Sequence, residues 1–193
     1  MRRVLAFGAV CAAGLVLAPM APSGAQPLER EHYSFHDEDQ FIDDECGEAM
    51  TIDYTIDGSG VFMLKQGRRG DPTPYFFDNY YSVETYTNVE NGATATVVHQ
   101  GLFKDLQVEH VEDTIYRFTA IESGRPITVY GPDGEKLIFD AGRIRYTFLV
   151  DTLGDTDLDN DVFLGDVEDP SVAGPHPVFV GEVDFCDLLD LLR

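Results

Sequence analysis

The ten residues GRIRYTFLVD, positions 142–151, carry the clearest structural signal in the chain. Apolar and polar side chains alternate along them, with Ile144, Tyr146, Phe148 and Val150 facing one way and Arg143, Arg145, Thr147 and Asp151 facing the other. A period of two residues is typical of a strand with one face buried and one face in water. A wet face favours antiparallel pairing over parallel pairing.

The same period recurs upstream, where Ile52, Tyr54 and Ile56 alternate with polar residues. Turn signals separate the candidate strands, at residues 57–60, 91–92 and 131–134. Further strands are expected at residues 161–167, as a partner of the 142–151 strand, and at residues 178–183. The sequence therefore predicts an all-β protein, an antiparallel β-sandwich or barrel of about 8–10 short strands.

The last ten residues break this pattern. Asp184 is followed by leucines at helical spacing, up to Leu192. An aspartate is a favoured first cap of a helix because its carboxylate accepts from free backbone N–H groups. We expect a short C-terminal helix whose leucines fold onto the β domain.

Charge limits the classes of partner. The 193 residues contain 35 Asp and Glu against 13 Lys and Arg, for a formal net charge of -22, and 44% are apolar. That apolar share is enough for the core of one domain. The acidity argues against nucleic acid as a partner. Adaptation to salt would also account for the acidity, without any ligand.

The N-terminus has the three parts of a secretory signal peptide. Arg2 and Arg3 precede an apolar run, and Ser23-Gly24-Ala25 supplies small residues before Gln26. We expect cleavage after residue 25, a secreted, extracellular protein, and no membrane insertion after signal removal. Residues 26–45 are acidic and poor in apolar side chains, so this segment is expected to be flexible.

Two of the three cysteines lie outside the leader, Cys46 and Cys186. In an oxidising compartment, such a pair at the two ends of a domain predicts a disulfide. Two free thiols in a metal or redox site are the alternative, which no C-x-x-C motif supports. Residues 46–193 are thus expected to form one disulfide-clamped β domain.

One acidic loop has the spacing of a calcium site. Counted from Asp155, carboxylates fall at positions one, three, five, seven and twelve, as Asp155, Asp157, Asp159, Asp161 and Asp166. Calcium takes oxygen ligands that converge from one short loop. The sixth position is Asn160 instead of glycine, so an acidic hairpin turn without a metal is the competing interpretation.

Other chemistry is weakly indicated. The aromatic stretch at residues 75–86 suits core packing better than sugar stacking. His99 and His110 are placed on candidate neighbouring strands, so a shared site is one hypothesis. No nucleophile motif, metalloprotease motif or phosphate loop is present in the sequence. Whether the protein is an enzyme stays open, with a non-enzymatic role favoured.

Turn residues and the cysteine pair also carry a resemblance. The segments in question are Cys46-Gly47, Thr87-Asn88, Asn91-Gly92, residues 131–134, 140–142 and 174–177, and Phe185-Cys186. In this order they resemble uncharacterised small secreted β-proteins of high-GC Gram-positive bacteria. The resemblance implies a shared fold and export, and it implies no activity and no site residues.

The leading functional hypothesis is a secreted, non-enzymatic extracellular or cell-surface binding module for an unknown ligand or protein. The first alternative is a calcium-dependent structural or adhesive protein that uses the 155–166 loop. The second is a small hydrolase or isomerase with its site in a barrel mouth.

Overall fold

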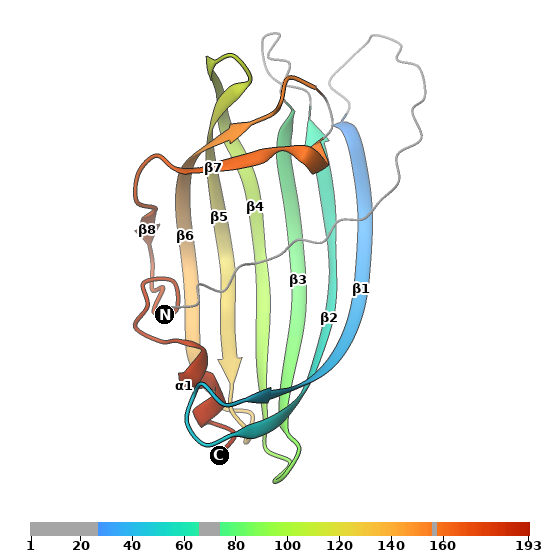
Figure 1. The fold of residues 1–193 in the computed structure, drawn as a ribbon, viewed down its shortest axis with the longest axis vertical. Helices are drawn as coiled ribbons and strands as arrows, with labels where there is room; N and C mark the ends of the chain where they lie inside the picture. Colours follow the sequence, from blue (N-terminus) through green and yellow to red (C-terminus); the bar gives the residue numbers. More distant parts are fainter. Residues whose placement is uncertain (1–26, 66–73, 156–157) are drawn as a thin grey trace.

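The computed structural model describes residues 27–65, 74–155 and 158–193, which form one sheet and a short helix (Figure 1). The elements are, in chain order, β1 (Pro27–Asp43), β2 (Met50–Lys65), β3 (Tyr75–Asn88), β4 (Thr94–Glu112), β5 (Ile115–Tyr130), β6 (Lys136–Asp151), the 3₁₀ turn η2 (Leu158–Asn160), β7 (Val162–Asp166), β8 (Ser171–Ala173) and α1 (Phe185–Asp190).

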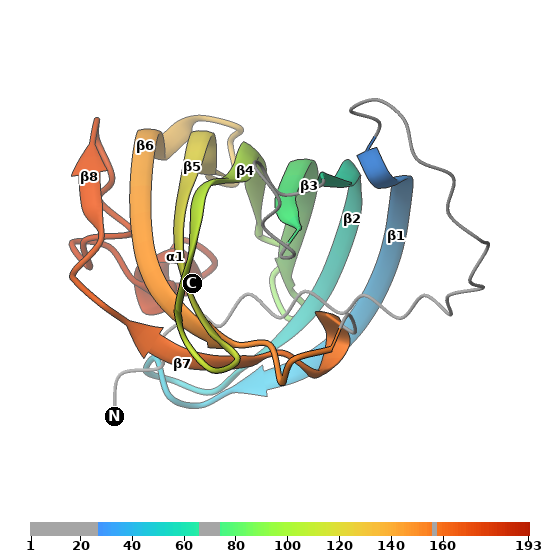
Figure 2. The same cartoon turned by 90° about the horizontal axis from the view of Figure 1, so that it is seen from above.

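The sheet is an antiparallel meander. Each strand from β1 to β6 pairs with the next strand in the sequence, and β8 also pairs with β6. Figure 2 shows the sheet curling into a half-barrel. The predicted all-β antiparallel class with a short C-terminal helix is confirmed. Of the two architectures that the sequence left open, the single curled sheet is nearer to a barrel.

The strands are longer than the sequence suggested, with 14 to 19 residues in each of β1 to β6. Residues 57–60, predicted as a turn, lie inside β2 and pair with both neighbouring strands. A side chain at Gly58 would collide with the ring of Phe35, and one at Gly60 with the ring of Tyr33. These glycines make room for aromatic rings and do not reverse the chain.

The expected flexible segment at residues 26–45 is a second correction. Residues 27–43 form β1, which pairs with β2 from Pro27↔Lys65 to Asp43↔Met50. The sequence did not predict this strand because residues 34–40 are all exposed to solvent, so the stretch lacks the alternation of apolar and polar residues that marks a half-buried strand. The strand predicted at residues 178–183 is also absent, since this segment forms turns closed by backbone hydrogen bonds such as Val180 N–H to His176 O at 3.0 Å.

Helix α1 packs on the concave side of the sheet, at one end of the half-barrel (Figures 1 and 2). Leu188, Leu189 and Leu192 join a buried cluster with residues of four strands, namely Met50, Ile52, Tyr86, Ala95, Val97 and Val129. Asp184 caps the helix as predicted, accepting from the N–H groups of Cys186 and Asp187. In the part of the chain that the structure describes, no helix is both long and apolar enough to cross a membrane.

A disulfide fixes the helix to the loop between β1 and β2. The Sγ atoms of Cys46 and Cys186 are 2.06 Å apart, so the predicted pair is confirmed. Arg193 supports the same junction by donating to the carbonyl oxygens of Cys46 at 3.0 Å and Glu48 at 2.8 Å. One end of the half-barrel is therefore clamped.

Candidate functional site

The contacts of α1 identify the concave side of each strand. Because side chains alternate, the strand register then assigns every paired residue to the concave or the convex side. Beyond the end covered by α1, the inner strands β3, β4 and β5 each carry one carboxylate on the concave side, Asp78, Asp105 and Glu122. We call these carboxylates, with the rings and phenols around them, the concave acidic site.

The first carboxylate is reached by a tyrosine two strands away. Tyr33 on β1 crosses above Gly60 on β2, and its hydroxyl lies 3.0 Å from both carboxylate oxygens of Asp78 on β3. Burial raises the pKa of Asp78, and the hydrogen bond from Tyr33 opposes part of that rise.

The same arrangement recurs on the next strands. Tyr80 on β3 crosses above Gly101 on β4 and donates to Oε1 of Glu122 on β5. Tyr146 on β6 donates to the other oxygen, Oε2, at 3.0 Å. Burial, and then the charge of Glu122, raises the pKa of both phenols, so both keep their protons at neutral pH.

The remaining carboxylate, Asp105 on β4, accepts a backbone hydrogen bond and has a raised pKa. Its Oδ2 accepts the backbone N–H of Phe76 at 2.7 Å. Burial raises the pKa of Asp105 to about 6, although the hydrogen bond from Phe76 opposes the rise. A carboxyl that titrates in the neutral range is a frequent feature of functional sites.

Aromatic rings form a band beside the carboxylates. Ring centroids are 5.3 Å apart for Phe62 and Phe76, 5.7 Å for Phe76 and Phe103, and 6.2 Å for Phe103 and Tyr146. The band thus runs from β2 to β6. Tilted and edge-on contacts are favourable geometries for aromatic rings. The face of an aromatic ring carries negative partial charge, which attracts cations.

A buried contact between a carboxylate and a histidine separates this band from the core under α1. Glu84 Oε1 lies 3.1 Å from His99 Nε2, and Tyr86 donates to Glu84 Oε2 at 2.6 Å. His99 Nδ1 lies 2.8 Å from the carbonyl oxygen of Pro126 and so carries a proton. Burial alone would raise the pKa of Glu84, but His99 and then Tyr86 outweigh it and lower that pKa.

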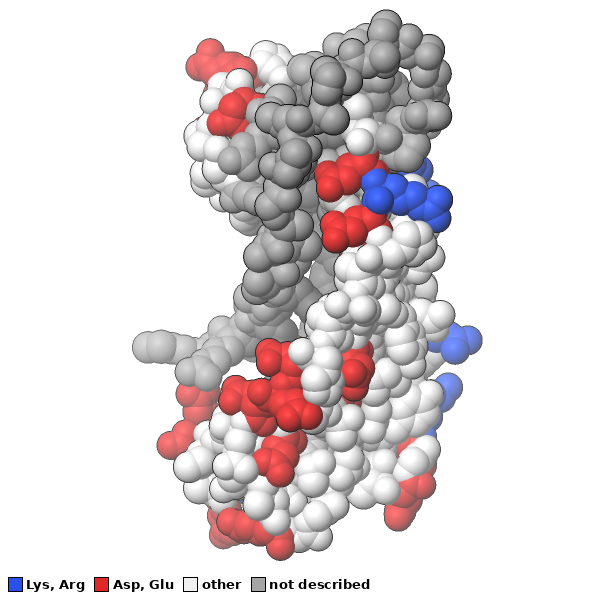
Figure 3. All heavy atoms as spheres, turned by 90° about the vertical axis from the view of Figure 1, so that its right-hand side faces the viewer, with Lys and Arg blue, Asp and Glu red and all other residues white. Residues whose placement is uncertain are grey.

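The lysines and arginines of the described strands β1 to β6 lie on the opposite side of the sheet. Strand register assigns most of these side chains to the convex side, and contact with the convex rings of Phe77 and Phe139 assigns the others. The residues are Arg30, Lys65, Lys104, Arg117, Arg125, Lys136, Arg143 and Arg145. In Figure 3 the blue side chains lie to the right, on the convex side. Among the described residues, no lysine or arginine forms an ion pair with the three carboxylates of the concave acidic site.

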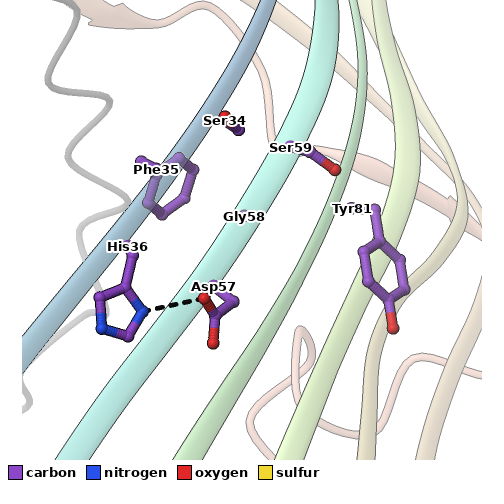
Figure 4. A pocket seen from close by; sticks show the side chains of 7 residues that line it. All are labelled: Ser34, Phe35, His36, Asp57, Gly58, Ser59 and Tyr81. Carbon is purple, nitrogen blue, oxygen red and sulfur yellow. Dashed lines mark hydrogen bonds and ion pairs between the residues drawn. The ribbon is translucent and has the colours of Figure 1, made fainter.

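A separate hollow of about 400 Å³ lies over β1, β2 and β3 (Figure 4). His36 and Asp57 line it and are joined by a 2.8 Å hydrogen bond from Nδ1 to Oδ1. Asp57, and then Glu38, raises the pKa of His36 by hydrogen bonding. Because the hollow is open and its histidine and aspartate are already paired with each other, we rank it below the concave acidic site.

The predicted calcium loop is only partly within the described residues. Asp157 and the side chain of Asp159 lie outside them. Asp155 accepts from Asn160 Nδ2 at 3.1 Å, and Asp166 is an exposed residue of β7. Among described residues, no group of three His, Cys, Asp or Glu could hold a metal ion. Calcium binding stays a prediction.

The predicted histidine pair is wrong as to position. His99 and His110 lie on one strand, β4, not on neighbours. His99 is buried beside Glu84, whereas His110 is exposed and lies 3.0 Å from the carbonyl oxygen of Asp113. The aromatic stretch is divided: Tyr86 is core, as predicted, while Phe76 and Tyr80 belong to the concave acidic site.

Sequence reasoning missed the three carboxylates of this site. Two signals pointed to them: Asp78 alternates with Phe76 and Tyr80, and Asp105 follows Phe103 two residues later. A carboxylate in register with aromatic residues faces the same side of a strand.

Comparisons of the chain with protein-family models, with curated proteins and with solved structures gave no match.

Proposed function

We propose that this protein is a secreted binding module whose concave acidic site takes a small organic cation with an apolar body, such as an aromatic or alkyl amine. The supporting observation is the separation of charge across the sheet. Asp78, Asp105 and Glu122 accept hydrogen bonds from uncharged donors alone, among the described residues. Partly buried carboxylates without a counter-charge favour a ligand that brings one.

The aromatic band supports the apolar half of this ligand. Phe76 and Phe103 lie on the same strands as Asp78 and Asp105, in the neighbouring concave positions. A cation over an aromatic face gains about 0.5–2 kcal/mol, depending on how far it is desolvated. One ligand can therefore place its charge at the carboxylates and its apolar body on the rings.

The test is calorimetric titration with three probes of similar shape: benzylamine, benzyl alcohol and benzoate. Benzylamine should bind at least about 10-fold more tightly than benzyl alcohol, and benzoate should not bind. Glu122→Gln should weaken benzylamine binding. The matched control is Glu109→Gln, which removes an exposed carboxylate that lies 3.5 Å from Arg117. Equal affinity for benzylamine and benzyl alcohol would refute the proposal.

The pH dependence gives a second readout. Asp105, with its pKa of about 6, is largely ionised at pH 7.5 and largely protonated at pH 5. Benzylamine keeps its charge at both values, so its affinity should fall at pH 5. Asp105→Asn should remove most of that fall, and an unchanged fall in this variant would assign the titration to another group.

A role in acid–base chemistry is the second candidate, and the same carboxyl favours it. A group with a pKa near the working pH is suited to proton transfer. Incubation with an amine that also carries a ketone, in D₂O and followed by NMR, would reveal exchange at the carbon next to the carbonyl, which can take up the electron pair left by proton removal. Exchange that Asp105→Asn abolishes would establish an enzyme, and its absence would leave the binding module.

Export is supported by the disulfide and by the sequence of residues 1–25. Expression of the full chain in an exporting host should yield an extracellular product that begins at Gln26. A product that keeps Met1 and stays inside the cell would contradict export.

A further inference from the structure

Strand β1 forms one edge of the sheet. It pairs with β2 along its whole length, and no other described strand lies on its other side (Figures 1 and 2). Backbone N–H and C=O groups of a strand point alternately to its two sides, so about half of those in β1 face away from β2. With 17 residues, this is a long edge without a described partner strand; along it, the N–H groups of Glu38 and Gln40 donate to the carboxylates of Asp37 and Asp39.

This edge combines exposed apolar side chains with acidic ones. Phe35 is 47% exposed and Ile42 is 69% exposed. Between them lie three exposed carboxylates, Asp37, Glu38 and Asp39. Figure 3 faces this edge and shows red side chains gathered on it. Exposed apolar residues on an unpaired edge indicate a surface that another chain covers.

A second copy of the chain fits this edge poorly. Two β1 strands placed side by side would bring the same carboxylates together, and like charges across a strand pair are destabilising. The β7 edge of another copy carries Asp166 and follows Asp161, so it is also acidic. Inward charges on edge strands commonly prevent such self-pairing.

We propose that the free edge of β1, over residues 34–42, adds an extended lysine- or arginine-rich segment of a partner polypeptide as a new antiparallel or parallel strand. Backbone hydrogen bonds would supply affinity, and the alternate side chains would supply specificity. Because Asp37 and Asp39 face the concave side and Glu38 the convex side, basic residues on either face of the added strand meet a carboxylate.

The experiment uses the oxidised chain and three labelled nonapeptides, measured by fluorescence anisotropy. The first alternates lysine with valine, the second has the same sequence with every other amide N-methylated, and the third carries glutamate in place of lysine. The first should bind, and the other two should bind at least about 10-fold more weakly, since N-methylation removes strand hydrogen bonds but keeps the charge.

Two double variants localise the site. Asp37→Asn with Asp39→Asn should weaken binding of the lysine–valine peptide at least about 10-fold. Asp133→Asn with Glu135→Gln removes two exposed charges from the β5–β6 turn and should leave its affinity within about 2-fold. Hydrogen exchange should slow in residues 34–42 when the peptide is bound.

Three results would overturn the proposal. The N-methylated peptide could bind as tightly as its parent, which would mean attraction by charge alone. The two double variants could lose affinity equally. Finally, sedimentation without peptide could show a dimer with slowed exchange in β1, which would make a second copy the occupant.

Discussion

Tyr80 lies directly above Gly101, and its ring occupies the space that a side chain at that glycine would need: a Cβ there would come within 2.7 Å of the tyrosine Cζ. Only because this position is a glycine can the phenol cross β4 and reach Glu122 on β5. Tyr33, Gly60 and Asp78 repeat the arrangement on β1, β2 and β3.

Gly101→Ala should therefore displace the Tyr80 ring and break its hydrogen bond to Glu122. We expect a loss of about 1–3 kcal/mol in unfolding free energy, which denaturant titration would measure. Tyr80→Ala removes the clashing ring, so Gly101→Ala added to it should cost little. Additive losses in this double-mutant cycle would show that the two residues are not coupled.

Asp105→Asn should stabilise the protein at pH 7.5 and not at pH 4. Folding raises the pKa of Asp105 to about 6. The contribution of Asp105 to folding stability is therefore complete below the pKa of the unfolded chain, and it is lost as the pH rises through 6. An asparagine at this position carries no charge to bury, and its side-chain oxygen can still accept the backbone N–H of Phe76. The expected gain is about 1–3 kcal/mol at pH 7.5, measured by thermal unfolding across pH. A gain that did not shrink at pH 4 would contradict the assignment.

Glu84→Gln should destabilise the protein by about 1–3 kcal/mol, because it replaces the buried carboxylate that lies 3.1 Å from His99 Nε2 and accepts from Tyr86. Replacing both residues, with His99→Gln added, should cost less than Glu84→Gln alone. Chemical denaturation at pH 7 would compare the two variants. If the double variant were less stable than Glu84→Gln, the contact between Glu84 and His99 would not be the reason for the loss.

Replacement of Cys46 and Cys186 by alanine should lower the free energy of unfolding by about 2–5 kcal/mol. The cross-link joins residues 140 positions apart, so it removes many conformations from the unfolded chain. Reducing agent should reproduce the loss in the natural chain and leave the alanine variant unchanged. Equal stability of the two proteins under oxidising conditions would contradict this expectation.

The sequence predicted those parts of the fold that depend on local pattern. The alternation at residues 144–150 appears in β6, the Asn91-Gly92 signal lies at the β3–β4 turn, and Asp184 caps α1. The turn predicted at residues 57–60 is wrong because a glycine in a strand and a glycine in a turn cannot be distinguished without knowledge of the adjacent strand. The aromatic rings that fill the space above Gly58 and Gly60 come from β1, more than 20 residues earlier.

The concave acidic site could not be read from the sequence for a related reason. Asp78, Asp105 and Glu122 are three among 35 acidic residues, and the aromatic neighbours of Asp78 and Asp105 do not show that these residues lie on one side of the same sheet. Strand register brings them together, and register depends on pairing between distant segments. The disulfide was easier to predict, because only two of the three cysteines, Cys46 and Cys186, lie outside residues 1–25.

The distribution of charge across the sheet also makes the molecule an electric dipole. Lysines and arginines on the convex side and carboxylates on the concave side produce a moment that runs through the sheet, on top of the net charge of -22. A diffusing cation experiences this field before it touches the protein and is drawn toward the concave side. The rate of encounter should consequently depend steeply on ionic strength, even where the final contacts are largely apolar.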